Sequence, residues 1–255
     1  LEIVRDVSGG KLKGGDIGST EIVLHPGKEY KFADPSCFAV FTLWQWNDNS
    51  EVERGYYPRG GGEVHIRVNP TKQLNAINLV DSGNVVRIWG WSFVAGSLPI
   101  KVAHLMADGA TQTIRRSLRN VDVKIERYKE DPEVAVGNGS GIILVSETSA
   151  GCLLGGCALG RRELKAEQVG QNAADELLQS INCGACVDSY SQDQMIIFMA
   201  IAHGKSRVKC GPVTLHTKTA IHVAEELTEA KFNIINEGPE SYIIECEGIG
   251  LKNSI

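Results

Sequence analysis

The final third of the chain has the clearest pattern of apolar and polar positions. Residues 166–181 carry apolar side chains at intervals of four, which predicts an amphipathic helix with one buried face: Val169, Ala173 and Leu177. A second helix is expected to begin at Asp188 or Ser189, either of which can cap it, and to end near residue 202, before Gly204. The longest apolar run of the chain, 195–202, falls in this second helix and favours a buried position.

Strands and helices are predicted to alternate in the segment that follows. Residues 207–210 are expected to form a short strand, and a helix capped by Thr217 or Thr219 should run to about residue 230. Residues 231–235 and 242–246 have the pattern of a hairpin. This alternation indicates a layered α/β fold, with α and β elements stacked against each other.

The middle of the chain predicts a separate, small α/β unit. Strands are expected in four segments: 63–68, 85–91, 121–128 and 142–145. A helix is expected over 98–118, although Gly109 can interrupt it. Nearer the start, residues 1–7 are expected to end a helix and 21–24 to form a short strand, whereas the aromatic-rich stretch 28–50 has no pattern that extends beyond it.

Composition restricts the classes of partner. The 255 residues are 42% hydrophobic, enough for a substantial core, and contain no apolar run long enough for a membrane span, so no membrane partner is expected. A formal net charge of −5 argues against a broad basic surface, and no DNA partner is expected. Recognition of a single RNA end needs only a few local cations and stays open.

Seven cysteines in a chain of this size favour a reducing compartment. Cys183 and Cys186 form a CxxC pair, but no second pair follows at the spacing of a zinc site. We interpret 183–186 as small residues in a turn between two helices. No metal site made of protein ligands is therefore predicted.

His216 differs from the other five histidines because it lies where a strand gives way to a helix. Three hydroxyl residues flank it: Thr214, Thr217 and Thr219. Backbone N–H groups at the start of a helix, helped by hydroxyl groups, bind phosphate. A neutral imidazole there could attack a phosphorus atom as a nucleophile. From position alone, a structural role for His216 is still favoured.

Two further segments contain candidate binding residues. Tyr190, Asp193 and Gln194 are spaced to share one helix face, where they could stack on a base and bond to a base edge or ribose. The alternative is an ordinary first turn of a helix. In 54–64, three consecutive glycines precede a strand, and Arg54 with Arg59 could hold phosphate, although neither common nucleotide fingerprint is present.

Taken in order, five segments resemble the RNA 3'-terminal phosphate cyclases: IGSTEI (17–22), RGYYPRGGGEV (54–64), ETSAGCLLGGCALGRRELKAEQVG (147–170), SYSQDQ (189–194) and GPVTLHTKTAIH (211–222). The resemblance implies repeated βαβαββ units, as in enolpyruvyl-shikimate-phosphate synthase, with a small inserted α/β domain. It divides the chain into three parts: a partial cyclase core (1–71), the inserted domain (72–165), and a C-terminal core with the nucleotide site and catalytic histidine (166–255).

The resemblance also implies an activity. His216 would attack the α-phosphate of ATP and carry AMP, which would pass to an RNA 3'-phosphate before closure to a 2',3'-cyclic phosphodiester. Tyr190, Asp193 and Gln194 would contact the nucleotide, and Mg²⁺ or Mn²⁺ would accompany it. The expected partners are ATP and RNA with a 3'-phosphate end, and eukaryotic members imply residence in the nucleus.

The chain also departs from the family's pattern. The family begins with a glycine-rich segment bearing a Glu and several Arg residues, and this sequence starts after that segment. Between the segments that match IGSTEI and RGYYP the family has a longer stretch, which residues 28–50 do not resemble. These differences imply a chain truncated at its N-terminus and internally, with impaired activity. The alternative is a non-catalytic, cyclase-like scaffold of ribosomal RNA processing, a group that lacks the histidine. A carboxyvinyl transferase rests on likeness of fold alone.

Overall fold

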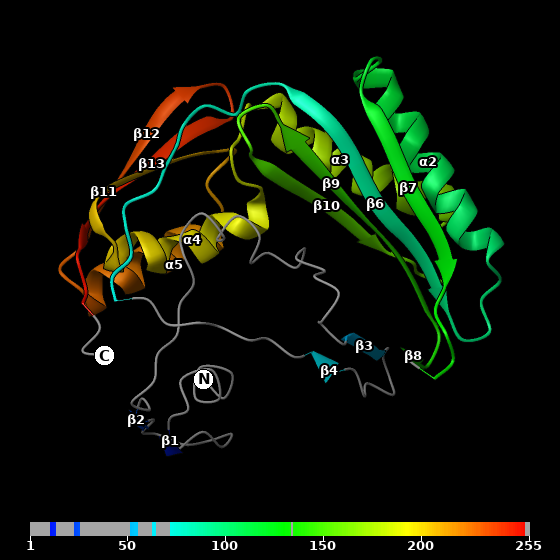
Figure 1. Cartoon of the computed structure of the whole chain (residues 1–255), viewed down its shortest axis with the longest axis horizontal. Helices are drawn as coiled ribbons and strands as arrows, with labels where there is room; N and C mark the ends of the chain where they lie inside the picture. Colours follow the sequence, from blue (N-terminus) through cyan, green and yellow to red (C-terminus); the bar gives the residue numbers. More distant parts are fainter. Residues whose placement is uncertain are drawn as a thin grey trace.

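A computed structural model describes residues 72–133 and 135–252, together with four short strands earlier in the chain (Figure 1). These strands are β1 (Lys11–Lys13), β2 (Val23–His25), β3 (Val52–Gly55) and β4 (Glu63–Val64). β1 pairs with β2, and β3 joins β4 to β8 (Ala135–Val136). The predictions for 1–7 and 28–50 lie outside the described residues.

The first four-stranded sheet belongs to what we call the inserted unit, which runs from β6 to α3. Its strands are β6 (Val85–Ala95), β7 (Asp122–Lys129), β9 (Gly139–Thr148) and β10 (Leu153–Leu159), in the order β10-β9-β6-β7. β6 and β7 are parallel and are joined by α2 (Lys101–Ser117), whereas the other pairs are antiparallel. α3 (Ala166–Asn182) follows β10 and packs on β9, β10 and α2.

The core of the inserted unit lies between this sheet and its two helices. Sheet residues such as Ile142, Leu144 and Leu154 pack there against Met106 and Ile114 of α2. The three residues that predicted the amphipathic face of α3 are also in this core, which confirms that prediction: Val169, Ala173 and Leu177. Burial of apolar area on this scale is the main stabilising contribution to such a unit.

Gly109 does not interrupt the helix, so the prediction that it could was wrong. α2 is continuous from Lys101 to Ser117, and Gly109 is buried. A Cβ atom at Gly109 would collide with the Glu167 backbone of α3, and one at Gly170 would collide with the Met106 carbonyl of α2. Glycine serves here to bring two helix backbones into close contact, which outweighs its low helix propensity.

The second four-stranded sheet belongs to the C-terminal unit. Its strands are β5 (Asn78–Leu79), β11 (His203–Cys210), β12 (Lys231–Gly238) and β13 (Ser241–Ile249), in the order β12-β13-β11-β5. β5 and β11 are parallel, and the β12–β13 hairpin confirms the predicted one. α4 (Ser189–Ile201) and α5 (Leu215–Leu227) pack on this sheet and on each other. β11 begins at His203, directly after α4 and earlier than predicted.

The chain order of this unit is β5-α4-β11-α5-β12-β13, which is the βαβαββ arrangement expected from the resemblance. The inserted unit interrupts it between β5 and α4 (Figure 1). Buried side chains of α4, β11 and β13 form its core, including Met195, Met199, Val208 and Ile244. The α/β fold class is confirmed: each described four-stranded sheet forms one layer and a pair of helices forms the other.

Two boundaries differ from the predicted ones. The inserted domain is predicted to end at residue 165, but α3 shares the core of the inserted unit, so this unit extends to Asn182. The helix expected to be capped by Thr217 or Thr219 begins earlier. Its cap is Thr214, whose side chain accepts a hydrogen bond from Thr217 N.

No helix in the described part of the chain is both long and apolar enough to cross a membrane.

The close contact between α2 and α3 leads to a testable prediction. At Gly170, an added Cβ would overlap the Met106 carbonyl and approach Ala110 N to 2.8 Å. We expect Gly170→Ala to lower the free energy of unfolding by about 1–3 kcal/mol, because overpacking outweighs the better helix propensity of alanine. Urea unfolding measures this. Gln179→Ala, at an exposed position of the same helix, should change it by less than about 0.5 kcal/mol. A Gly170→Ala protein as stable as the wild type would contradict the predicted clash.

Candidate functional site

Asp188 fixes the start of α4 at the junction between the two units. Its Oδ1 accepts hydrogen bonds from Tyr190 N at 3.1 Å, Ser191 N at 2.8 Å and Ser191 Oγ at 2.9 Å. Its Oδ2 accepts one from Gly155 N of β10 at 2.8 Å. The carboxylate is buried, and these donors compensate for its loss of water. Asp188 is therefore the helix cap that the sequence allowed and also a link to the inserted unit.

Tyr190 lies in the first turn of α4 and is 50% exposed. Its hydroxyl donates to Glu176 Oε1 of α3 at 2.9 Å, while Glu176 Oε2 accepts from Cys157 N of β10 at 2.7 Å. Partial burial, followed by the hydrogen bond to Glu176, raises the pKa of Tyr190 above its usual value. The hydroxyl therefore remains a donor at neutral pH, and Tyr190 is held by the inserted unit at one end.

Asp193 and Gln194 follow on the same helix, one turn further along. Asp193 is partly buried and Gln194 is exposed. Neither side chain forms a hydrogen bond or ion pair with another residue in the described parts of the chain. Within the described parts of the chain, these two side chains therefore do not stabilise the fold through polar contacts.

His216 is the second residue of α5 and is exposed. Within the described residues its imidazole has no hydrogen-bond or ion-pair partner. Its place is set instead by its neighbours in the chain, because Thr214 caps the helix and Thr217 is fully buried. The histidine thus lies in the first helical turn, not before the helix as the predicted cap implied.

Gln192 connects the first turn of α4 to the first turn of α5. Its Oε1 accepts hydrogen bonds from Thr214 N at 3.0 Å and Thr217 Oγ1 at 2.6 Å, and its Nε2 donates to the Pro212 carbonyl at 3.4 Å. Sequence reasoning missed this residue. The structure therefore brings together the starts of the two helices that carry the candidate residues: Tyr190, Asp193, Gln194 and His216.

Other predicted features lie elsewhere. Arg54 belongs to β3, but Arg59 and the three glycines at 60–62 fall outside the described residues. The CxxC segment lies between α3 and α4, as predicted, and the six described cysteines are free. No group of three or more His, Cys, Asp or Glu side chains suited to a metal ion occurs among the residues that the structure describes.

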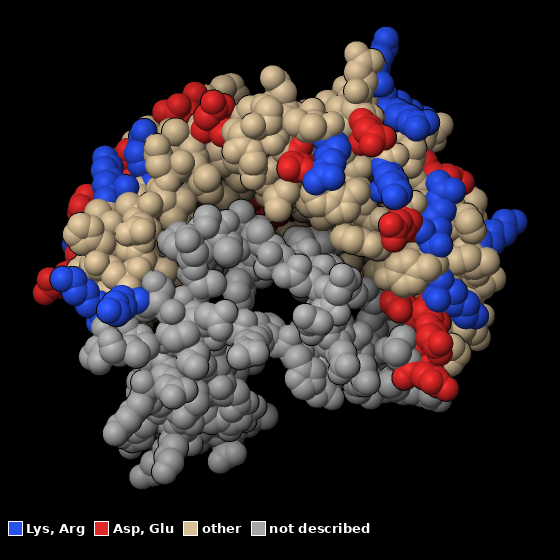
Figure 2. Space-filling view, in the orientation of Figure 1, with Lys and Arg blue, Asp and Glu red and all other residues tan. Residues whose placement is uncertain are grey.

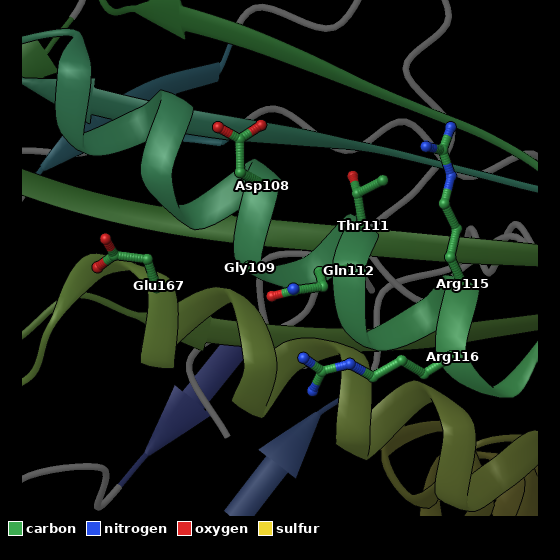
Figure 3. A pocket seen from close by; sticks show the side chains of 7 residues that line it. All are labelled: Asp108, Gly109, Thr111, Gln112, Arg115, Arg116 and Glu167. Atoms are coloured by element: carbon green, nitrogen blue, oxygen red, sulfur yellow. The ribbon is translucent and has the colours of Figure 1, made fainter.

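A surface groove between α2 and α3 contains none of the predicted site residues (Figure 3). Arg115 and Arg116 line it, but their side chains point in different directions. Asp108 and Glu167 line the same groove, and Asp108 forms an ion pair with Arg127 at 2.8 Å. The groove therefore lacks a convergent set of cations for an anionic ligand.

The charge distribution agrees with the acidic balance of the sequence. Figure 2 shows Lys and Arg interspersed with Asp and Glu over the described part of the visible face. The described part of this face therefore presents a mixture of both charges and not a broad basic surface. The candidate site is thus a local arrangement at the starts of α4 and α5.

The fold and the site define an α/β protein with a βαβαββ unit, an inserted α/β unit and polar residues on two adjoining helix starts. The family model for the "RNA 3'-terminal phosphate cyclase (RTC), insert domain" matches residues 80–182, which include the whole inserted unit. The protein is 36% identical over 206 residues to a Drosophila melanogaster RNA 3'-terminal phosphate cyclase, and 38% identical over 246 residues to a Dictyostelium discoideum protein described as a probable one.

These alignments cover 80% and 91% of this chain, and 57% of each relative. An RNA 3'-terminal phosphate cyclase of Pyrobaculum neutrophilum is 33% identical over 238 residues, covering 91% of this chain and 67% of the relative. The chain therefore belongs to the RNA 3'-terminal phosphate cyclase family. It spans just over half the length of the first two relatives.

The contact between Glu176 and Tyr190 can be tested by titration. Replacing Glu176 with Gln removes a negative charge that raises the pKa of Tyr190, so we expect this pKa to fall toward the usual tyrosine value. NMR of labelled tyrosines, with the Tyr190 signal assigned through Tyr190→Phe, measures the shift. Asp175→Asn, at the preceding and exposed position of α3, is the control. An unchanged pKa in Glu176→Gln would refute the contact.

Proposed function

We propose that this protein uses ATP to convert an RNA 3'-terminal phosphate into a 2',3'-cyclic phosphodiester, with His216 as the nucleophile that carries AMP. Family membership supports the reaction class, and relatives are named for it. One observation carries the assignment of residues: Gln192 joins the helix start bearing Tyr190 to the helix start bearing His216. A nucleotide held by α4 would then have the imidazole of α5 beside it.

In the first proposed step, an imidazole nitrogen of His216 attacks the α-phosphorus of ATP. A P–N bond forms, the bond from that phosphorus to the bridging oxygen breaks, pyrophosphate leaves, and the imidazole gives up its proton to solvent. The exposure of His216 and its freedom from side-chain partners among the described residues support this role. Covalent catalysis of this kind divides one difficult displacement into easier ones.

In the second step, an oxygen of the RNA 3'-phosphate attacks the phosphorus of the bound AMP, the P–N bond breaks, and the imidazole takes a proton back from solvent to regenerate His216. In the third step, the neighbouring 2'-hydroxyl attacks the RNA phosphorus. AMP leaves with the electron pair of the broken P–O bond, and the hydroxyl proton is lost. A poor leaving group on the RNA phosphate has thereby been exchanged for a good one.

Nucleotide recognition is assigned to α4. The exposed half of Tyr190 can stack on the adenine, while Asp193 and Gln194 can bond to the ribose hydroxyls or the base edge. The divalent cation expected with ATP is proposed to arrive bound to the triphosphate, as Mg²⁺ commonly does. A nuclear location, expected from eukaryotic members, is proposed together with this activity.

The nucleophile is tested with α-labelled ATP. Because the departures from the family's pattern imply impaired activity, we expect the chain to acquire a weak acid-labile label, and we expect His216→Ala to abolish it because the P–N bond would be formed by the His216 imidazole. His222→Ala provides a matched control, since His222 is exposed on the same helix, and should keep the label. Peptide mapping locates the label. A label that survives His216→Ala, or a wild-type chain that stays unlabelled, would reject the proposed nucleophile.

Substrate recognition is tested separately. We expect Asp193→Ala to raise the ATP concentration needed for half-maximal labelling about tenfold, which corresponds to the loss of roughly 1.4 kcal/mol from a hydrogen bond to a charged group. Asp175→Ala, exposed on α3, should leave this ATP concentration unchanged.

The RNA substrate is tested in the same labelling assay. RNA with a 3'-phosphate should discharge the label, whereas RNA with a 3'-hydroxyl should not. Discharge by both RNAs would contradict the assigned substrate.

A further inference from the structure

The side chain of Gln192 is buried at the contact between α4 and α5, with 2% exposure. Its amide makes three hydrogen bonds to the segment that leads into α5 or to its first turn: Pro212 O, Thr214 N and Thr217 Oγ1. It also contacts the Cys210 thiol at the end of β11. The carbonyl oxygen has two acceptor positions, and the donors of Thr214 and Thr217 occupy both of them. The amide nitrogen donates to Pro212 O. The residue is thus saturated on its acceptor side.

The three contacts surround the position of His216. Thr214 caps the helix two residues before the histidine, and Thr217 follows directly after it. The Thr217 hydroxyl donates to Gln192 and lies 3.0 Å from the Thr214 hydroxyl, while Thr217 N donates to Thr214 Oγ1 at 3.1 Å. Since the His216 imidazole has no partner of its own among the described residues, the backbone held by this network determines where the imidazole can reach.

Gln192 belongs to the same first turns of α4 as the candidate nucleotide residues, but it is buried whereas Tyr190 and Gln194 are exposed. Residues two apart on a helix point to nearly opposite sides. The outer side of α4 would therefore hold the nucleotide, while the inner side holds the turn that bears His216. A single rigid helix would set the distance between the two.

We propose that Gln192 is a positioning residue, which fixes the first turn of α5 to α4 so that His216 faces the α-phosphate of a nucleotide held by α4. It acts through Thr214 and Thr217 and touches neither ATP nor the reacting atoms. The consequence for rate rests on the proposed function, whereas the mechanical link rests on the hydrogen bonds alone.

The first experiment measures single-turnover labelling with α-labelled ATP in four variants: Gln192→Ala, Thr217→Val, Thr217→Ser and the double variant Gln192→Ala with Thr217→Val. We expect the first two to slow labelling on the order of tenfold to a hundredfold with little change in the half-saturating ATP concentration, because a misplacement of about 1 Å carries a penalty of that size. Thr217→Ser keeps the hydroxyl and should restore the rate to near that of the wild type. The double variant should be no slower than the worse single one.

Two controls separate positioning from general loss of stability. Gln179→Ala removes an exposed glutamine from α3, and Thr113→Val removes a hydroxyl that donates to Gly109 O of its own helix α2 at 3.0 Å. Both should label at the wild-type rate, and melting temperatures are recorded for every variant. Wild-type labelling rates in Gln192→Ala, or multiplied losses in the double variant, would overturn the proposal.

The second experiment needs no activity. Hydrogen–deuterium exchange is followed in peptides that cover 213–219, in the wild type and in Gln192→Ala. Faster exchange confined to this turn supports the link, and unchanged exchange overturns it. If the wild-type chain is not labelled by ATP, the proposed function fails, while the exchange result still decides whether Gln192 holds this turn.

Discussion

The arrangement of the candidate site depends on the buried carboxylate of Asp188. One of its oxygens caps α4, and the other accepts a hydrogen bond from Gly155 in β10 of the inserted unit. Removing a carboxylate from water is costly unless donors replace the water, and here backbone N–H groups of two units and the Ser191 hydroxyl do so. The direction in which α4 leaves the junction is therefore fixed, and the contacts of Tyr190 and Gln192 follow from it.

The inserted unit therefore contributes hydrogen bonds that hold the candidate site in place. Its strand β10 supplies the donor to Asp188, and its helix α3 supplies the acceptor for the Tyr190 hydroxyl. On the other side of the insertion, the C-terminal sheet closes through the parallel pairing of Leu79 with Val208. The chain thus leaves the βαβαββ unit after β5, builds a second core, and returns at Asp188 in position to begin α4.

The sequence pattern predicted those features that depend on residues close together in the chain. The spacing of Val169, Ala173 and Leu177 predicted the buried face of α3, and an Asp before an apolar run predicted the cap of α4. The start of α5 was predicted too late because Thr214, Thr217 and Thr219 can all cap a helix. The choice is made by a tertiary contact, since Gln192 accepts a hydrogen bond from Thr214 N across 22 residues of sequence.

The contacts that join elements were beyond sequence reasoning. Gln192 looked like any polar residue of a helix, and its partners become apparent only when α5 packs on α4. Likewise, the local pattern of α3 assigns no partner to Glu176, and its contact with Tyr190 arises only in the folded chain. His216 was selected by resemblance of an ordered set of segments, because its position alone did not separate it from a structural histidine.

The most direct test of this account is a crystal structure of the chain with an ATP analogue whose α–β bridging oxygen is replaced by methylene, so that pyrophosphate cannot leave. The account predicts the adenine against Tyr190 and the α-phosphorus within reach of an imidazole nitrogen of His216, at the adjoining starts of α4 and α5. A nucleotide bound elsewhere, such as the groove between α2 and α3, or one whose α-phosphate faces away from His216, would contradict it.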